Sequence, residues 1–158
     1  MLTVRGLRAK NNMITEALHA LDHFRESFNT ATSRTDRSVI GQFLTPASIA
    51  HFMASMFESG EQNVRMLDPG AGTGVLFAAC VELLISRKTP PLSIEVVAYE
   101  TDRTILPYLE KTMKRCDALC KSVDVSFRGT IKREDFLLSA ITGIEELNTV
   151  GQRTSRVV

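Results

Sequence analysis

Three glycines follow an acidic residue in the segment Asp68-Pro69-Gly70-Ala71-Gly72-Thr73-Gly74, and this spacing predicts a ligand-binding turn. Because glycine has no Cβ atom, these positions allow a tight turn and let a ligand lie against the backbone. The N–H groups where a helix follows would suit a carboxylate as well as a phosphate. The dinucleotide pattern Gly-x-Gly-x-x-Gly does not fit, because position 75 is Val, and the Gly-Lys-Ser or Gly-Lys-Thr end of a nucleoside-triphosphate loop is absent. A tight turn without a ligand is the alternative.

Two more acids follow predicted strands. Glu100 ends the second strand, where a carboxylate could accept two hydrogen bonds from a ribose diol and would disfavour a phosphate. Asp135 and Phe136 follow the third strand. There the carboxylate could accept from an adenine amine while the ring covers the face of the base. The alternatives are a solvated acid at Glu100 and a helix cap at Asp135.

The elements that position these residues alternate between strands and helices. Strands are predicted for 64–68, 94–100 and 123–127, a helix for 75–86, and a second helix after Asp102, which could cap it. Pro107 is expected to delay the start of that second helix by a turn. This βαβαβ order predicts an α/β fold, with a buried first strand and the first half of a doubly wound sheet. The predicted ligand-binding residues would then share one edge of that sheet.

Two helices are predicted before the sheet. Apolar residues recur at helical spacing within 13–29, and a polar loop follows over 30–38. Thr45 is expected to cap a helix that begins at Pro46 and ends near Gly60. We therefore divide the chain into an N-terminal helix and loop, 1–38, and a partial binding domain, 39–158.

The composition limits the class of protein further. A chain of 158 residues with 44% hydrophobic and 23% charged residues is typical of one globular domain, without an apolar run long enough for a membrane span and without a secretory signal. Cys80, Cys116 and Cys120 are an odd number without a Cys-x-x-Cys pair, which predicts buried thiols in a reducing cytoplasm. His19 and His23 lie one helical turn apart without a third ligand, so no metal site is predicted.

Taken in order, the motifs resemble those of the gamma-class adenine-specific (N6) DNA methyltransferases of restriction-modification systems. The resemblance covers about residues 39–138 and is carried by Gly41-Gln42-Phe43-Leu44-Thr45-Pro46, the glycine-rich segment, Tyr99-Glu100 and Asp135-Phe136-Leu137. It implies a Rossmann-like methyltransferase fold with S-adenosylmethionine as the cofactor. The first of these motifs is typical of DNA-amino methyltransferases, whereas the glycine-rich turn is shared by most methyltransferases.

The resemblance also implies which residues bind the cofactor. Phe43, Thr45 and Pro46 would pack on its methionine end, Glu100 would bind the ribose, and Asp135 with Phe136 would contact the adenine. The full predicted set is Phe43, Thr45, Pro46, Asp68, Gly70, Ala71, Gly72, Gly74, Glu100, Asp135 and Phe136.

The catalytic motif of that family, Asn-Pro-Pro-Tyr or Asp-Pro-Pro-Tyr, does not occur in this chain, so no catalytic residue is predicted. We expect a fragment that stops just before this motif, binds the cofactor weakly or not at all, and is inactive alone. Its parent would transfer a methyl group to the exocyclic amine of adenine in double-stranded DNA. A specificity subunit is a candidate partner, and so is a second copy at the open edge of the first strand. The alternatives are a methyltransferase acting on RNA or protein, and a non-catalytic remnant or partner-binding module.

Overall fold

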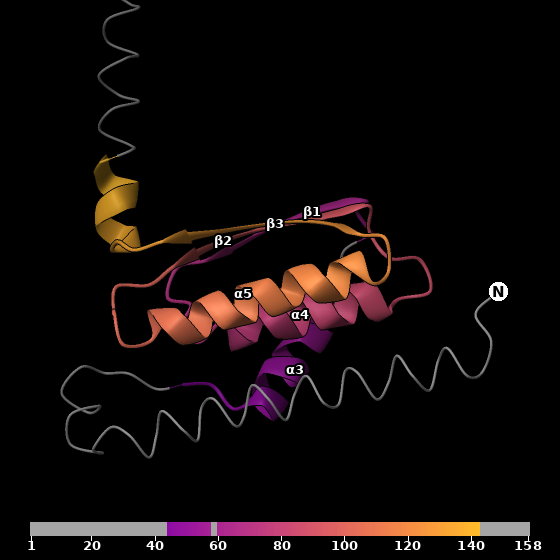
Figure 1. Ribbon diagram of the computed structural model, residues 1–158, viewed down its shortest axis with the longest axis horizontal. Coiled ribbons are helices and arrows are strands. Elements are labelled where there is room, and N and C mark those ends of the chain that lie inside the picture. Colours follow the sequence, from indigo (N-terminus) through magenta and orange to yellow (C-terminus); the bar gives the residue numbers. More distant parts are fainter. Residues whose placement is uncertain (1–43, 58–59, 143–158) are drawn as a thin grey trace, which may run out of the picture.

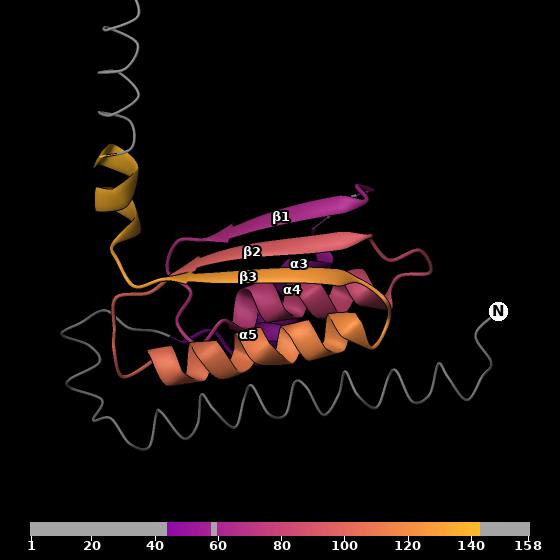
Figure 2. The same cartoon turned by 45° about the horizontal axis from the view of Figure 1, so that its top comes forward.

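The computed structural model describes residues 44–57 and 60–142, which form an α/β unit with a parallel three-stranded sheet (Figure 1). The strands are adjacent in the order β1-β2-β3, and β1 lies at an edge of the described sheet (Figure 2). Their bounds are Asn63–Asp68 for β1, Ser93–Tyr99 for β2 and Ser126–Lys132 for β3.

Two helices connect successive strands and cover the same face of the sheet, and a third packs against one of them (Figure 1). They are α4 (Val75–Ser86), α5 (Leu106–Lys121) and α3 (Ala47–Ser55), the last of which lies on α4. The predicted α/β class and βαβαβ order are therefore confirmed. The helix predicted for 13–29 lies outside the described residues, and the division at residue 38 stays a prediction.

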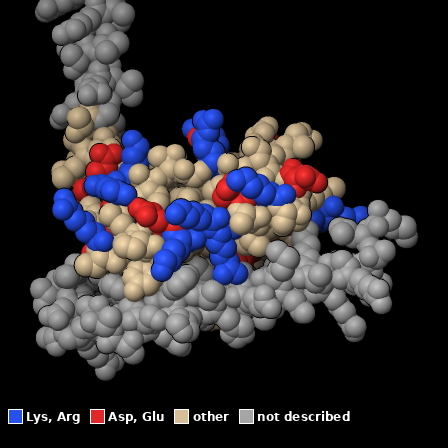
Figure 3. Space-filling view, in the orientation of Figure 1, with Lys and Arg blue, Asp and Glu red and all other residues tan. Residues whose placement is uncertain are grey.

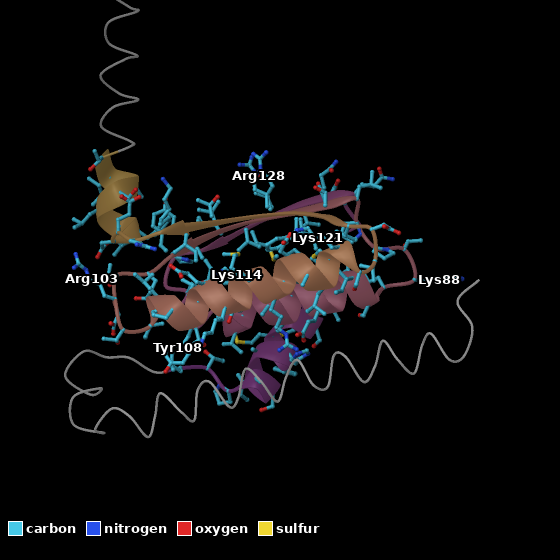
Figure 4. The ribbon with its side chains drawn as sticks, viewed as in Figure 1. Lys88, Arg103, Tyr108, Lys114, Lys121 and Arg128 are labelled. Atoms are coloured by element: carbon cyan, nitrogen blue, oxygen red, sulfur yellow. The ribbon has the colours of Figure 1, made fainter. Side chains whose placement is uncertain are left out.

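Strand alternation decides which face of the sheet is buried. On β2, Ile94, Val96 and Ala98 are at most 1% exposed, because they face α4 and α5. The opposite face carries polar and apolar side chains: Arg65 of β1 pairs with Glu95 of β2 at 2.9 Å, Leu67 of β1 is 56% exposed, and Arg128 of β3 points away from the helices (Figure 4). The prediction of a buried first strand is wrong for that face, because no described helix covers it.

The third strand lies further along the chain than predicted. The alternation over 123–127 indicated a strand there, but Asp124 has a φ of 58°, which interrupts extended backbone. The strand begins at Ser126 and continues through Gly129, where an added Cβ would overlap the side chain of Met113 on α5. A glycine inside a strand weakens the sequence signal, and here it permits close packing of a helix.

The helix starts also differ in detail from the predictions. Pro107 does delay α5, which begins at Leu106, but its N-cap is Ile105; the Asp102 carboxylate accepts from the Thr104 N–H at 2.7 Å instead. The N-cap of α3 is Pro46, not Thr45, and no side chain caps that helix. Pro46 itself has extended backbone, with a ψ of 146°, so the helix begins one residue later than predicted, at Ala47.

Helix α3 is shorter than predicted and contacts α4 through small residues. It ends at Ser55 rather than near Gly60, and its buried residues are Ala47, Ala50 and Ala54. The larger apolar side chains that predict this helix are exposed; they are Ile49, Phe52, Met53 and Met56. Because alanine methyl groups are small, the two helices can approach closely.

A polar group is buried between these helices. The Glu82 carboxyl on α4 is 1% exposed, and its Oε2 lies 3.2 Å from Nε2 of His51 on α3. Burial raises the pKa of Glu82 to about 7, although the positive charge of Arg115 on α5 acts in the opposite direction. Burial lowers the pKa of His51. In the folded chain Glu82 is therefore protonated well below pH 7 and about half protonated near pH 7.

This burial predicts a pH-dependent gain in stability for Glu82→Gln. Since the folded-state pKa exceeds the ordinary value of 4.5, stability is greatest below pH 4.5 and is lost as the pH rises through 7. The full loss is about 3 kcal/mol, at ~1.4 kcal/mol for each pKa unit. We expect the Glu82→Gln variant to match the wild type at pH 4 and to be more stable by up to that amount at pH 8, in urea unfolding. Exposed Glu134→Gln should give no gain, and equal gains at both pH values would contradict the prediction.

Candidate functional site

Four of the eleven predicted site residues, Gly70, Glu100, Asp135 and Phe136, line a cavity of about 470 Å³ at the carboxyl ends of the three parallel strands. A cavity of this volume is within the range of small-molecule sites. Its wall comes from the turn after β1, the end of β2 and the segment after β3. The lining residues are Pro69, Gly70, Tyr99, Glu100, Thr101, Glu134, Asp135, Phe136 and Leu137.

Glu100 holds the glycine-rich turn in place. Its Oε2 accepts a hydrogen bond from the Gly72 N–H at 2.9 Å, and its Oε1 accepts from the Asp102 N–H at 2.8 Å. The Ala71 N–H donates to the Tyr99 carbonyl at 2.9 Å, which ties the turn to β2 a second time. The half-buried Glu100 is therefore more than a solvated acid. Sequence reasoning missed this role, because it needs two segments that only the sheet brings together.

Two of the three glycines are required by the backbone itself. Gly72 has a φ of 54° and Gly74 a φ of 83°, both in the left-handed region that favours glycine. A Cβ at Gly74 would also lie 2.6 Å from the ring of Phe77. A Cβ at Gly70, in contrast, would meet no atom within 4 Å. Gly70 lines the cavity, so its missing side chain leaves space for a ligand.

Three backbone N–H groups of the glycine-rich turn already donate hydrogen bonds within the protein. The N–H groups of Ala71 and Gly72 bond to β2 and to Glu100, and the Gly74 N–H donates to the Ala71 carbonyl at 2.7 Å. The sequence placed the candidate donors at the start of the helix, and of these three groups only the Gly74 N–H, at the N-cap of α4, lies there. The expectation of a free donor therefore fails for Gly74, while the N–H groups of Ala71 and Gly72 stabilise the turn itself.

Asp68 offers an acceptor beside the turn. Burial raises the pKa of its carboxyl, the Gly70 backbone N–H acts in the opposite direction, and the negative charge of Glu100 raises it further. Its Oδ2 is buried, with no hydrogen-bond partner among the described residues. A buried acceptor without a partner costs free energy, and a ligand that donates a hydrogen bond would remove that cost.

The segment before α3 lies over the glycine-rich turn. Leu44 Cδ2 is 3.1 Å from the position that a Cβ of Gly72 would occupy. Thr45 and Pro46 follow it and are half-buried. The structure thus brings this segment, predicted from a motif far away in the sequence, to the turn. Phe43 lies outside the described residues.

Asp135 and Phe136 both reach the cavity, but one carboxylate oxygen of Asp135 is already in use. Its Oδ1 accepts from the N–H groups of Leu137 and Leu138 at 2.8 and 3.1 Å, so Asp135 caps the helical residues that begin at 136. The Phe136 ring packs edge-on against Tyr99, with centroids 5.2 Å apart. The helix-cap alternative is therefore present, and a ligand role for Asp135 would involve its other oxygen. Tyr99 is a lining residue that we did not predict, although an aromatic residue beside a strand-end acid is a usable signal.

Basic side chains near the cavity are paired with acids. Arg133 bonds Glu110 at 2.8 Å, and Lys132 lies 4.0 Å from Glu134. Basic and acidic side chains are interspersed on the face shown in Figure 3, and the lysines of α5, such as Lys114 and Lys121, lie on this side (Figures 3 and 4). The described surface in this view is therefore of mixed charge near the site.

The cysteine side chains are wholly or partly buried. Cys116 and Cys120 are buried, as predicted, whereas Cys80 is only half-buried. Burial raises the pKa of all three thiols, that of Cys120 to about 11, so they are neutral at pH 7.

Over 44–57 and 60–142, no three histidine, cysteine or acidic side chains are placed to hold a metal ion. No helix in the same ranges is long and apolar enough to cross a membrane.

A family model and two related proteins assign the chain to the same family. The model of the family described as N-6 DNA Methylase matches residues 17–127. The chain is 29% identical, over 121 residues, to the Type II methyltransferase M.PstI of Providencia stuartii. The aligned region covers 77% of this chain and 24% of that protein. The chain is 35% identical, over 101 residues, to the Type II methyltransferase M.BsuBI of Bacillus subtilis, covering 63% of this chain and 19% of that protein. The chain thus spans about a quarter or less of the length of these relatives.

Proposed function

Because the chain belongs to the N-6 DNA Methylase family, we propose that it is the S-adenosylmethionine-binding part of a gamma-class adenine-specific DNA methyltransferase. The observation that carries this proposal is the cavity at the strand ends, with Glu100 tied to the glycine-rich turn on one side and Phe136 on the other. The Type II methyltransferases that the chain resembles support it.

The residues present fit the proposed cofactor. Glu100 can accept from ribose hydroxyls, because each carboxylate oxygen has lone pairs beyond those used by Gly72 and Asp102. The open face of Gly70 leaves room for the ligand, and Asp68 Oδ2 is an unused acceptor suited to an ammonium group. Phe136 supplies an aromatic surface for the adenine base.

In this proposal the protein binds and orients, while the bound cofactor supplies the methyl group on its sulfonium. Leu44, Thr45 and Pro46 would cover the methionine end, and the Glu100 carboxylate would fix the ribose, which together set the direction of the methyl group. The acceptor would be the exocyclic amine of an adenine in double-stranded DNA. The motif Asn-Pro-Pro-Tyr does not occur in these 158 residues, so the proposal assigns no catalytic residue within them.

The DNA substrate is favoured over RNA or protein by the segment Gly41-Gln42-Phe43-Leu44-Thr45-Pro46. Besides DNA, we propose two candidate partners. One is a separate specificity subunit, and the other is a second copy of the chain that pairs with the edge of β1. In the described residues β1 has a sheet neighbour on one side only. An unpaired strand edge is a template for pairing with another chain.

Titration calorimetry with S-adenosylhomocysteine tests the proposal, with Phe136→Ala as the variant. Loss of the ring removes the surface for the base, so we expect about tenfold weaker binding, since aromatic contacts contribute ~0.5–1.5 kcal/mol beyond their buried area. Leu138→Ala is the matched control, because Leu138 is 67% exposed and does not line the cavity. Absence of heat with the wild-type chain, or equal binding by both variants, would contradict the proposed site.

A further inference from the structure

The contact between α3 and α4 contains little that fixes one helix on the other. Three alanines form the buried face of α3, and burial of a methyl group contributes only about 0.8 kcal/mol. Small side chains let the two helices approach closely. Polar groups beside these alanines can add to the positioning of α3.

Among the described residues, one hydrogen bond joins the chain ends that follow these helices, and one close approach of polar atoms lies between the helices themselves. Arg87, just after α4, donates to the Phe57 carbonyl at 3.0 Å, at the exposed end of the interface. His51 and Glu82 meet in its interior, with Nε2 and Oε2 3.2 Å apart and side chains 27% and 1% exposed. The two atoms are close, but their directions do not form a good hydrogen bond, and neither Glu82 oxygen has another partner among the described residues.

The groups around this contact come from all three helices. Arg115 of α5 acts electrostatically on Glu82, and Glu82 acts on the Cys116 thiol of α5. A buried carboxyl with few partners is costly, and replacement of such a group by an apolar side chain often stabilises a protein. Its presence here is therefore weak evidence of a contribution to stability and points to another role.

Helix α3 continues directly from the segment that lies on the glycine-rich turn. The Ala50 N–H donates to the Pro46 carbonyl at 3.0 Å, so the first turn of the helix is bonded to that segment. Leu44, two residues earlier, packs over Gly72. Movement of α3 on α4 would therefore displace Leu44 from the turn.

We propose that His51 and Glu82 are positioning residues that fix α3 on α4 and so hold Leu44-Thr45-Pro46 against the glycine-rich turn. This inference rests on the proposed function in one respect, namely that the segment covers the cofactor. The contact itself concerns the free chain and can be tested without a ligand.

The first test compares cofactor affinity with stability. Glu82→Leu removes the contact but keeps a side chain of similar bulk, so we expect about tenfold weaker binding of S-adenosylhomocysteine by calorimetry, with an unchanged or higher midpoint of thermal unfolding. Glu82→Gln can still contact His51 and should retain wild-type affinity. His51→Leu should weaken binding like Glu82→Leu, and the double variant should be no weaker than either, because contacting residues are not additive. A purely structural role would instead make affinity follow stability.

The second test uses hydrogen exchange on the free, full chain. In the Glu82→Leu and His51→Leu variants we expect the Ala50 amide and its neighbours in α3 to exchange at least tenfold faster, while the amides of α5 keep their wild-type rates. If the wild type gives no heat with S-adenosylhomocysteine, the proposed function fails for this chain and the exchange result alone decides the inference. Unchanged exchange in α3 in both variants overturns it, whether or not the chain binds the ligand.

Discussion

Glu100→Ala is expected to weaken binding of S-adenosylhomocysteine by about 100-fold or more. The carboxylate holds two backbone N–H groups, those of Gly72 and Asp102, in addition to its proposed contact with the ribose. Hydrogen bonds to charged groups contribute ~1.5–3 kcal/mol each, and ~1.4 kcal/mol corresponds to a factor of ten in affinity. Removal of the side chain therefore costs both a ligand contact and the anchor of the turn, which titration calorimetry would detect as a loss of measurable heat.

Two controls separate these effects. Glu134→Ala removes an exposed acid from the wall of the same cavity but touches no backbone of the turn, so binding should change less than threefold. Glu100→Gln keeps one acceptor oxygen and replaces the other with a donor, so its affinity should lie between those of the wild type and Glu100→Ala. Wild-type affinity in Glu100→Ala would refute the role of Glu100, whereas equal losses in Glu100→Ala and Glu134→Ala would show a nonspecific effect of charge.

Gly74→Ala is expected to destabilise the folded chain by about 2–4 kcal/mol in urea unfolding. The backbone at Gly74 has a φ of 83°, where a side chain costs roughly 1 kcal/mol. The new methyl group would also lie 2.6 Å from the Phe77 ring and 3.0 Å from Leu109, and such overpacking adds ~1–3 kcal/mol. Since Gly74 is the N-cap of α4, the strain falls at the junction of the turn and the buried helix.

The same turn provides the matched control. Gly70→Ala adds a methyl group where no atom lies within 4 Å and where φ is outside the left-handed region, so stability should stay within about 0.5 kcal/mol of the wild type. Because Gly70 lines the cavity, this variant should instead weaken binding of the proposed ligand. Equal destabilisation by the two substitutions would mean that the backbone of the turn is not as described.

The sequence by itself determined the order of the elements and the edge of the sheet at which the candidate site lies. Local signals were sufficient for α4, whose bounds match the prediction, and for β1 and β2, which differ by about one residue. In a parallel sheet the carboxyl ends of the strands share one edge, so Glu100, Asp135 and the turn had to meet there. Family membership, shown by the match over residues 17–127, agrees with the motifs that carry the resemblance.

Only the tertiary structure decided those features that depend on contacts between segments far apart in the sequence. It moved the third strand to Ser126–Lys132, because Asp124 turns the chain and Gly129 fits against Met113. It also showed that Glu100 holds the glycine-rich turn, because the Gly72 N–H donates a hydrogen bond to its carboxylate. Local sequence patterns do not encode this contact. The burial of Glu82 beside His51 likewise arises only when α3, α4 and α5 pack together. Spacing and residue type specify local backbone and strand order, whereas desolvation and hydrogen-bond pairing depend on which surfaces finally meet.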